Sequence, residues 1–211
     1  MSKVLIIGTH RSGTTNLFNS LAEHLNLSSI EEPFNYYKWK TTKFSYPNDV
    51  FKYDVVKSLV THIPFNFSTE SLPFIMNYSN YMLDQRVRFM QDIVKRYKTT
   101  ILLTRKDRKA LAESYYRQLQ YGDHSNWHVK YTMEDVSTLN INMDFINTYC
   151  DFIETLGLTL KINVTYYEDL YSGNENKVKK AIDTWNLPIE TKDFMKYVDP
   201  YNRYRQNIDG N

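Results

Sequence analysis

The stretch Val4-Leu5-Ile6-Ile7-Gly8-Thr9-His10-Arg11-Ser12-Gly13-Thr14-Thr15 decides the fold of this 211-residue chain. Its first four residues are apolar and partly β-branched, which is typical of a strand buried on both faces of a parallel sheet. Gly8 and Gly13 bound a short loop. Apolar residues then recur at helical spacing and predict a helix from about Thr14: Leu17, Phe18, Leu21, Ala22 and Leu25. A strand, a glycine-bounded loop and a helix typically open an α/β nucleotide-binding domain.

The same alternation of apolar runs and helical patterns continues along the chain. It predicts a single three-layer α/β/α domain over residues 1–211, with a central parallel sheet and a P-loop-like phosphate-binding loop. Residues 26–82 read as loops and short elements, although residues 54–63 could form a core strand or a helix. Gly157 is placed to cap the C-terminus of a long helix. The other expected elements are strands at 99–104 and 160–167 and helices at 84–97, 107–120 and 174–187.

Composition limits the possible partners and chemistry. The net charge is +2, too small to indicate binding to nucleic acid or to an anionic membrane. The single cysteine, Cys150, excludes an intramolecular disulfide and a cysteine-based zinc site, and it lies on the apolar stripe of a predicted helix. The five histidines are scattered, so no metal site is expected. With no signal peptide and no apolar run of membrane-spanning length, the expected location is cytoplasmic.

Residues 8–15 match the Walker A spacing G-x-x-x-x-G-x-[ST], but Thr14 stands where the lysine would be. Backbone N–H groups and the helix dipole make such a loop an anion cradle, to which Ser12, Thr14 and Thr15 add hydroxyl donors. In kinases and NTPases the missing lysine reaches the β- and γ-phosphates. Its absence favours a donor with one 5′-phosphate and a terminal sulfonate, and Arg11 then supplies the positive charge.

A second basic motif follows the predicted strand at residues 99–104. Arg105 leaves the carboxyl end of that strand, where ligands bind in open α/β sheets. Ser114 lies about two and a half turns along the next helix. Arg105 and Ser114 could therefore face one pocket, although Arg105, Lys106 and Arg108 could also form an ordinary solvated cluster.

The sequence R-S-G-T-T at residues 11–15 resembles the 5′-phosphosulfate loop of sulfotransferases that use 3′-phosphoadenosine 5′-phosphosulfate (PAPS). Arg105 and Ser114 resemble the 3′-phosphate motif of that family, although Ser114 follows Arg105 by nine positions where many members have a separation of eight. The segment Y-E-D-L at residues 167–170 resembles one whose tyrosine lies near the adenine. These resemblances span residues 4 to 188 and are closest to the small bacterial and carbohydrate-type members.

The resemblance implies an enzyme that moves a sulfuryl group from PAPS to a hydroxyl or amine of a carbohydrate or small molecule. Adenosine 3′,5′-bisphosphate would be the product, and no metal would be needed. The mechanism would be in-line transfer with a general base, in which Arg11 stabilises charge. The residues it assigns to the donor are His10, Arg11, Ser12, Gly13, Thr14, Thr15, Arg105, Ser114 and Tyr167.

Two residues compete for the role of general base. Glu32 follows Arg11 by 21 positions, roughly where carbohydrate sulfotransferases place a catalytic glutamate. His62 lies in T-H-I-P, which resembles the T-H-L-P motif of cytosolic small-molecule sulfotransferases. We prefer Glu32, and Lys57 is a further candidate for lining the acceptor pocket. The rival functions are a P-loop kinase, which the absent lysine disfavours, and a non-catalytic nucleotide-binding module.

Overall fold

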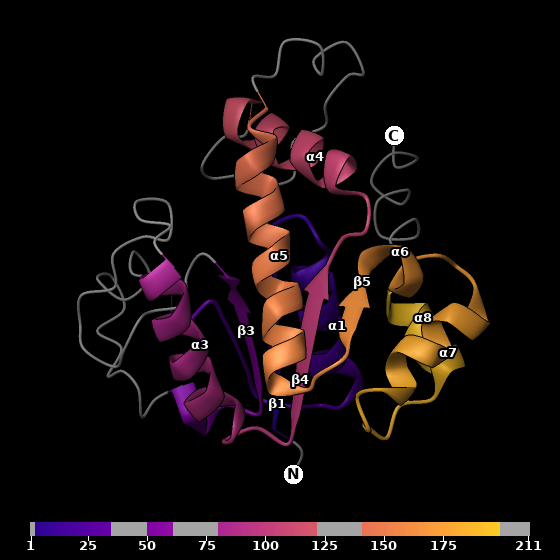
Figure 1. Cartoon of the computed structure of the whole chain (residues 1–211). Helices are drawn as coiled ribbons and strands as arrows, with labels where there is room; N and C mark the ends of the chain where they lie inside the picture. Colours follow the sequence, from indigo (N-terminus) through magenta and orange to yellow (C-terminus); the bar gives the residue numbers. More distant parts are fainter. Residues whose placement is uncertain (1–2, 35–49, 61–79, 122–140, 199–211) are drawn as a thin grey trace.

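The computed structural model describes residues 3–34, 50–60, 80–121 and 141–198. These residues form a five-stranded sheet in the order β2-β3-β1-β4-β5, and every neighbouring pair is parallel (Figure 1). The chain places β3 on one side of β1 and β4 on the other, so the order of the strands reverses at β1. The strands are β1 (Val4–Gly8), β2 (Ser29–Glu31), β3 (Val55–Leu59), β4 (Thr99–Thr104) and β5 (Val164–Tyr166).

Helices cover both faces of the sheet and give the expected three layers. Side chains alternate along a strand, so Val4 and Ile6 pack on the face that carries α1, α7 and α8, whereas Leu5 and Ile7 pack on the face of α3 and α5. The helices are α1 (Thr14–His24), α3 (Asn80–Val94), α4 (Arg108–Tyr121), α5 (Met143–Leu160), α6 (Tyr167–Leu170), α7 (Glu175–Asp183) and α8 (Thr191–Val198), and the 3₁₀ turn η1 spans Val50–Lys52.

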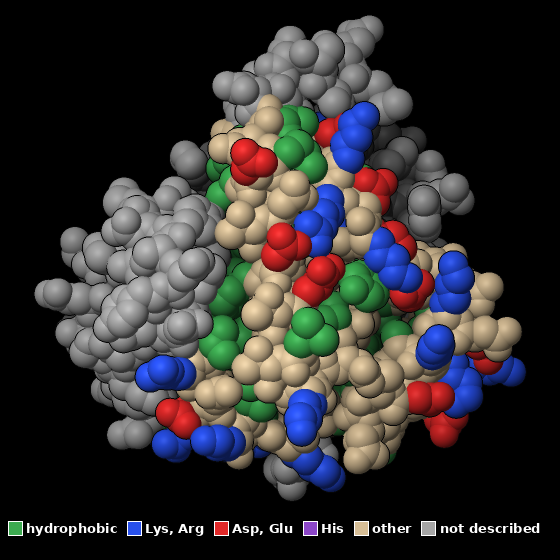
Figure 2. All heavy atoms as spheres, viewed as in Figure 1, with side chains coloured by type: hydrophobic (Ala, Val, Ile, Leu, Met, Phe, Trp, Pro, Cys, Tyr) green, Lys and Arg blue, Asp and Glu red, His purple; other side chains and the backbone are tan. Residues whose placement is uncertain are grey.

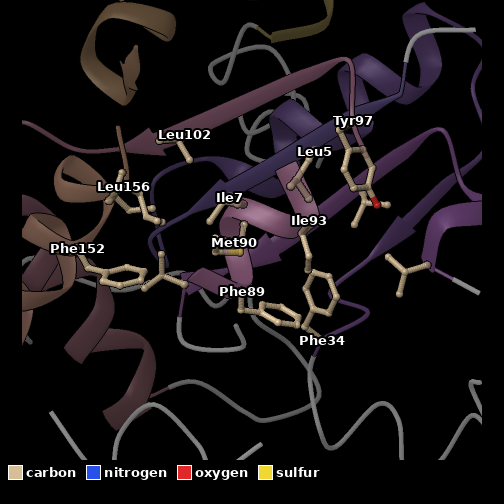
Figure 3. Packing of buried hydrophobic residues seen from close by; sticks show 14 of the residues in the cluster. Leu5, Ile7, Phe34, Phe89, Met90, Ile93, Tyr97, Leu102, Phe152 and Leu156 are labelled. Carbon is tan, nitrogen blue, oxygen red and sulfur yellow. The ribbon is translucent and has the colours of Figure 1, made fainter. Parts of the chain in front are cut away.

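The core on the α3 and α5 face shows why the strands read as continuous apolar runs. Leu5, Ile7 and Leu102 of the sheet face Met90 and Ile93 of α3, with Phe152 and Leu156 of α5 beside them (Figure 3). All of these residues are buried. Because helices also cover the opposite face of the sheet, apolar side chains are favoured on both faces of the strands.

The helix end predicted at Gly157 is wrong. Helix α5 continues to Leu160, and Lys161 takes the left-handed conformation that ends it, with φ 56°. The N–H of Ile162 donates to the carbonyl of Gly157 at 2.9 Å, which is the Schellman arrangement with Lys161 in the position usually held by glycine. Gly157 is needed for another reason, since a Cβ there would lie 2.6 Å from Cγ2 of Val164.

One further element differs from the sequence expectation. The strand expected over 160–167 is limited to Val164–Tyr166, because the helix end occupies its beginning and Tyr167 starts the short helix α6. The three-residue edge strand Ser29–Glu31 is one of the short elements expected over residues 26–82. The helices expected at 84–97, 107–120 and 174–187 are present with shifted ends, and residues 54–63 contain a strand.

The outer surface is mixed in charge on the face that carries α5. Figure 2 shows acidic and basic side chains interspersed over this face, with no broad field of one sign. Part of this pattern is a contact between helices, in which Arg108 of α4 pairs with Asp151 of α5 at 2.7 Å and Glu154 at 3.2 Å. Within the described ranges, no helix is long and apolar enough to cross a membrane.

Candidate anion-binding site at the carboxyl edge of the sheet

The loop of residues 9–13 begins at the carboxyl end of β1, between β3 and β4. Gly8 pairs in register with Leu59 on one side and with Leu103 on the other. This is the edge where ligands bind in open α/β sheets, at the point where the strand order reverses. The loop then enters α1 through Gly13, whose φ of 81° lies in the left-handed region.

The side chains of the loop divide into inward and outward groups. Ser12 is fully buried and its hydroxyl donates to the carbonyl of Thr9 at 2.7 Å, so this side chain supports the loop from within. Thr14 is also buried. Arg11 is partly exposed and its φ is 61°, which is uncommon outside glycine. The Ser12 hydroxyl is therefore not free to donate to an anion, and only the backbone N–H of Ser12 could do so. The positive charge of the loop comes from Arg11.

The loop and the second basic motif meet in the folded chain. Nε of Arg11 donates to Oγ of Ser114 on α4 at 3.0 Å, across a separation of 103 residues. The nine-position spacing from Arg105 thus places Ser114 against the loop. His10 lies beside them, with its ring centroid 5.5 Å from that of Tyr115 and 6.0 Å from that of Tyr149.

Arg105 extends from the carboxyl end of β4 and lies over Tyr167. Its guanidinium carbon is 3.9 Å from the centroid of that ring, a close cation–π contact. The ring of Tyr171 lies near the same tyrosine, with centroids 4.7 Å apart. Nε of Arg105 is buried and has no hydrogen-bond partner among the residues that the structure describes. A buried donor without a partner is costly, and a bound anion is one group that could satisfy it.

The residues that follow Arg105 are held by two carboxylates, those of Glu168 and Asp169. Lys106 bonds to Asp169 at 2.7 Å, and this hydrogen bond raises the pKa of Lys106. The carboxylate of Glu168 accepts from the backbone N–H of Lys106 at 2.9 Å and of Asp107 at 3.2 Å. Glu168 and Asp169 therefore fix the turn after β4.

A buried lysine joins the loop to the candidate base. Lys57 of β3 is 2% exposed, and its ammonium contacts Glu31 at 2.8 Å and Glu32 at 2.7 Å. It also donates to Oγ1 of Thr15 at 2.9 Å, and that hydroxyl in turn donates to Glu31 at 3.1 Å. Burying a lysine is expensive unless its charge is paired, and two carboxylates provide the pairing here.

Glu32 is held in an unusual backbone conformation immediately after β2. Its φ is 52°, and its N–H donates to the carbonyl of Lys57 at 2.7 Å. Residues other than glycine rarely adopt a positive φ, and those that do cluster at functional sites. Arg11 and Glu32, the two described residues that the sequence assigned to catalysis, both have this feature. His62, the rival base, lies outside the described residues.

Sequence reasoning missed Glu31, which completes the cluster, and two tyrosines that contact the loop. Tyr149 of α5 accepts a hydrogen bond from the N–H of His10 at 2.8 Å, and Tyr171 donates to the carbonyl of Gly13 at 2.7 Å. One signal was available for the cluster, because a lysine within the buried run of β3 is rare. Cys150 is not a candidate nucleophile, since burial raises the pKa of its thiol.

The comparisons with known proteins assign no family. No family model matches the chain, and a search of curated proteins finds no match. Within the part of the chain that the structure describes, no three histidine, cysteine or carboxylate side chains gather so as to hold a metal ion. The geometry of the site is therefore the basis for the function proposed below.

Proposed function

We propose that the protein is a sulfotransferase that uses PAPS as donor and transfers the sulfuryl group to a hydroxyl or amine of a carbohydrate or small molecule. The observation that carries the proposal is the contact between Arg11 and Ser114. It joins the glycine-bounded anion loop to the second motif at the carboxyl edge of the sheet. A donor with a 5′-phosphosulfate and a 3′-phosphate needs two anion sites at this edge, and Arg105 is available for the second.

The surroundings of Thr15 support sulfuryl transfer over triphosphate chemistry. In P-loop NTPases the hydroxyl at this position binds Mg²⁺. Here that hydroxyl accepts from the ammonium of Lys57 at 2.9 Å. The same hydroxyl donates to Glu31 at 3.1 Å, so a dication could bind Thr15 only by disrupting these two contacts. Thr14 in place of the usual lysine also reduces the positive charge available for β- and γ-phosphates.

The proposed reaction is an in-line displacement at sulfur. The acceptor oxygen or nitrogen attacks the sulfur, and its new bond forms as the bond from sulfur to the bridging phosphate oxygen breaks. The electron pair of that bond leaves with adenosine 3′,5′-bisphosphate. Arg11 and the loop N–H groups stabilise the charge that grows on the bridging oxygen and on the sulfonate.

Glu32 takes the acceptor proton in this proposal. Its side chain is 15% exposed, so it can meet a substrate, and Lys57 holds it in one orientation. The contact from Lys57 to Thr15 places this carboxylate near the start of α1, and thus near the loop that would hold the donor. Positioning of this kind accounts for much of the rate in group transfer.

A cytoplasmic location is part of the proposal, and the single buried thiol fits a reducing compartment.

The role of Arg105 offers a test with a matched control. Arg105→Ala should weaken binding of adenosine 3′,5′-bisphosphate about ten- to a hundredfold, the value of a charged hydrogen bond. Binding of adenosine 5′-monophosphate should change little, because it lacks the 3′-phosphate. Lys106→Ala, which removes the adjacent exposed charge, should preserve the wild-type ratio of the two affinities. Calorimetric titration measures both, and an unchanged ratio in Arg105→Ala would remove the second anion site from the proposal.

A further inference from the structure

Two tyrosine hydroxyls reach the anion loop from opposite faces of the sheet. Tyr149 comes from α5, on the face that also carries α3, and Tyr171 follows α6, on the face that carries α1. One bonds to the start of the loop and the other to its end. We propose that Tyr149 and Tyr171 form a clamp that sets the anion-binding conformation of the loop, and that they are positioning residues for the 5′-phosphosulfate. This inference rests on the proposed function.

The contact of Tyr149 fixes the first half of the loop. Its side chain is fully buried, and its hydroxyl accepts the N–H of His10 at 2.8 Å. The preceding amide, that of Thr9, donates to the carbonyl of Leu103 at 3.1 Å. The first two amides after β1 are therefore held by the protein, which leaves the ligand to the amides that follow. Phe145 stacks on the ring of Tyr149, so that ring is held independently of its hydroxyl.

The contact of Tyr171 acts where the loop becomes helix α1. Its hydroxyl donates to the carbonyl of Gly13 at 2.7 Å, the same carbonyl that accepts the N–H of Leu17 at 3.0 Å. A donor on this carbonyl polarises the Gly13–Thr14 peptide group, which strengthens the Thr14 N–H as a donor. That N–H is among the first of the helix, where anions bind.

The ring of Tyr171 also restricts what can stand at Gly13. A Cβ at this position would lie 2.6 Å from Cε2 of the tyrosine, and the φ of 81° already disfavours a side chain. The loop backbone and the tyrosine ring are thus in direct contact. Together the two hydroxyls restrain both ends of a loop that contains a second positive φ, at Arg11. Restraining a strained loop before the ligand arrives reduces the cost of ordering it on binding.

The test removes each hydroxyl while keeping each ring, with Tyr149→Phe, Tyr171→Phe and the double variant. Tyr97→Phe is the matched control, because the Tyr97 hydroxyl is also buried but has no hydrogen-bond partner within the described ranges. Tyr97 lies just before β4, at the opposite edge of the sheet. Calorimetry compares adenosine 3′,5′-bisphosphate with adenosine 3′-monophosphate. The ratio of these two affinities isolates the 5′-phosphate that the loop would bind, and a purely structural role would not change it.

Each clamp variant should reduce this ratio about three- to tenfold, the usual effect of losing one neutral hydrogen bond. Tyr97→Phe should leave it unchanged. If folded clamp variants keep the wild-type ratio, the clamp is refuted while the proposed function stands. If the wild-type protein binds neither nucleotide, the proposed function fails. In that event, inorganic pyrophosphate is titrated in place of the nucleotides. The clamp is refuted if a clamp variant binds pyrophosphate as tightly as the wild-type protein does, or if neither protein binds it.

Discussion

Replacing Glu32 separates catalysis from stability at the cluster around Lys57. Glu32→Gln keeps the size of the side chain and an oxygen that can still accept from Lys57, which is 2.7 Å from the present carboxylate. Lys57 also keeps its ion pair with Glu31 at 2.8 Å. Only the charge of one partner is lost, so the free energy of unfolding should fall by about 1 kcal/mol.

The effect on transfer should be much larger. A general base contributes about 10²- to 10⁴-fold to the rate, and the amide of glutamine cannot take the proton from the attacking hydroxyl or amine. The maximal rate of Glu32→Gln should fall by that factor, with donor affinity unchanged, because the donor binds to other residues. Transfer of labelled sulfuryl from PAPS to an acceptor used by the wild-type protein measures this rate, with donor and acceptor both saturating so that binding losses do not appear as chemical ones.

Glu31→Gln is the matched control, since the two carboxylates contact the same ammonium at nearly the same distance. Glu31 is also bonded to Thr15, so this variant should lose up to about tenfold in rate through positioning while keeping the base. A Glu32→Gln variant that retains more than about a tenth of the wild-type rate would refute the assignment. His62 would then become the leading candidate. Equal losses in the two variants would contradict the distinction drawn between the two carboxylates.

Two further predictions concern the fold. Burial of its hydroxyl raises the pKa of Tyr97 well above its usual value of about 10, so the ionisation of this group does not affect folding stability below about pH 10 and lowers it as the pH rises further. Tyr97→Phe should be neutral or stabilising near neutral pH and should flatten the alkaline decline in thermal unfolding; an unchanged decline would contradict the buried phenol. Gly157→Ala should destabilise the protein by about 1–2 kcal/mol in chemical denaturation, because overlap with Val164 outweighs the helix preference of alanine, and a more stable variant would contradict this packing.

The parts of the fold that the sequence predicted are those with local signals. Residues 4–7 and 101–103 are apolar runs buried on both faces, and each run stops one residue before the end of its strand. The start of α1 follows from Gly13 and the apolar stripe after it. Strand β2 lacks such a signal, because it is three residues long and its identity depends on pairing with β3.

The site was predictable to the extent that its residues lie in one continuous motif. Arg11 and Gly13 were identifiable because the loop is local. The Tyr149 hydroxyl accepts from a residue 139 positions away, and the Tyr171 hydroxyl donates to a residue 158 positions away. In the sequence, both tyrosines look like ordinary aromatic core residues. The pairing of Lys57 with two consecutive glutamates likewise requires β2 to lie beside β3 in a defined register.

If the proposed function is right, the loop and Arg105 together bind a 3′-phosphorylated adenine nucleotide in preference to a triphosphate. Calorimetric titration of the wild-type protein with adenosine 3′,5′-bisphosphate, and separately with ATP and Mg²⁺, measures this preference. We expect the bisphosphate to bind at least about tenfold more tightly, because Arg105 adds a charged hydrogen bond that ATP cannot use. Equal or tighter binding of ATP would refute the proposed donor site.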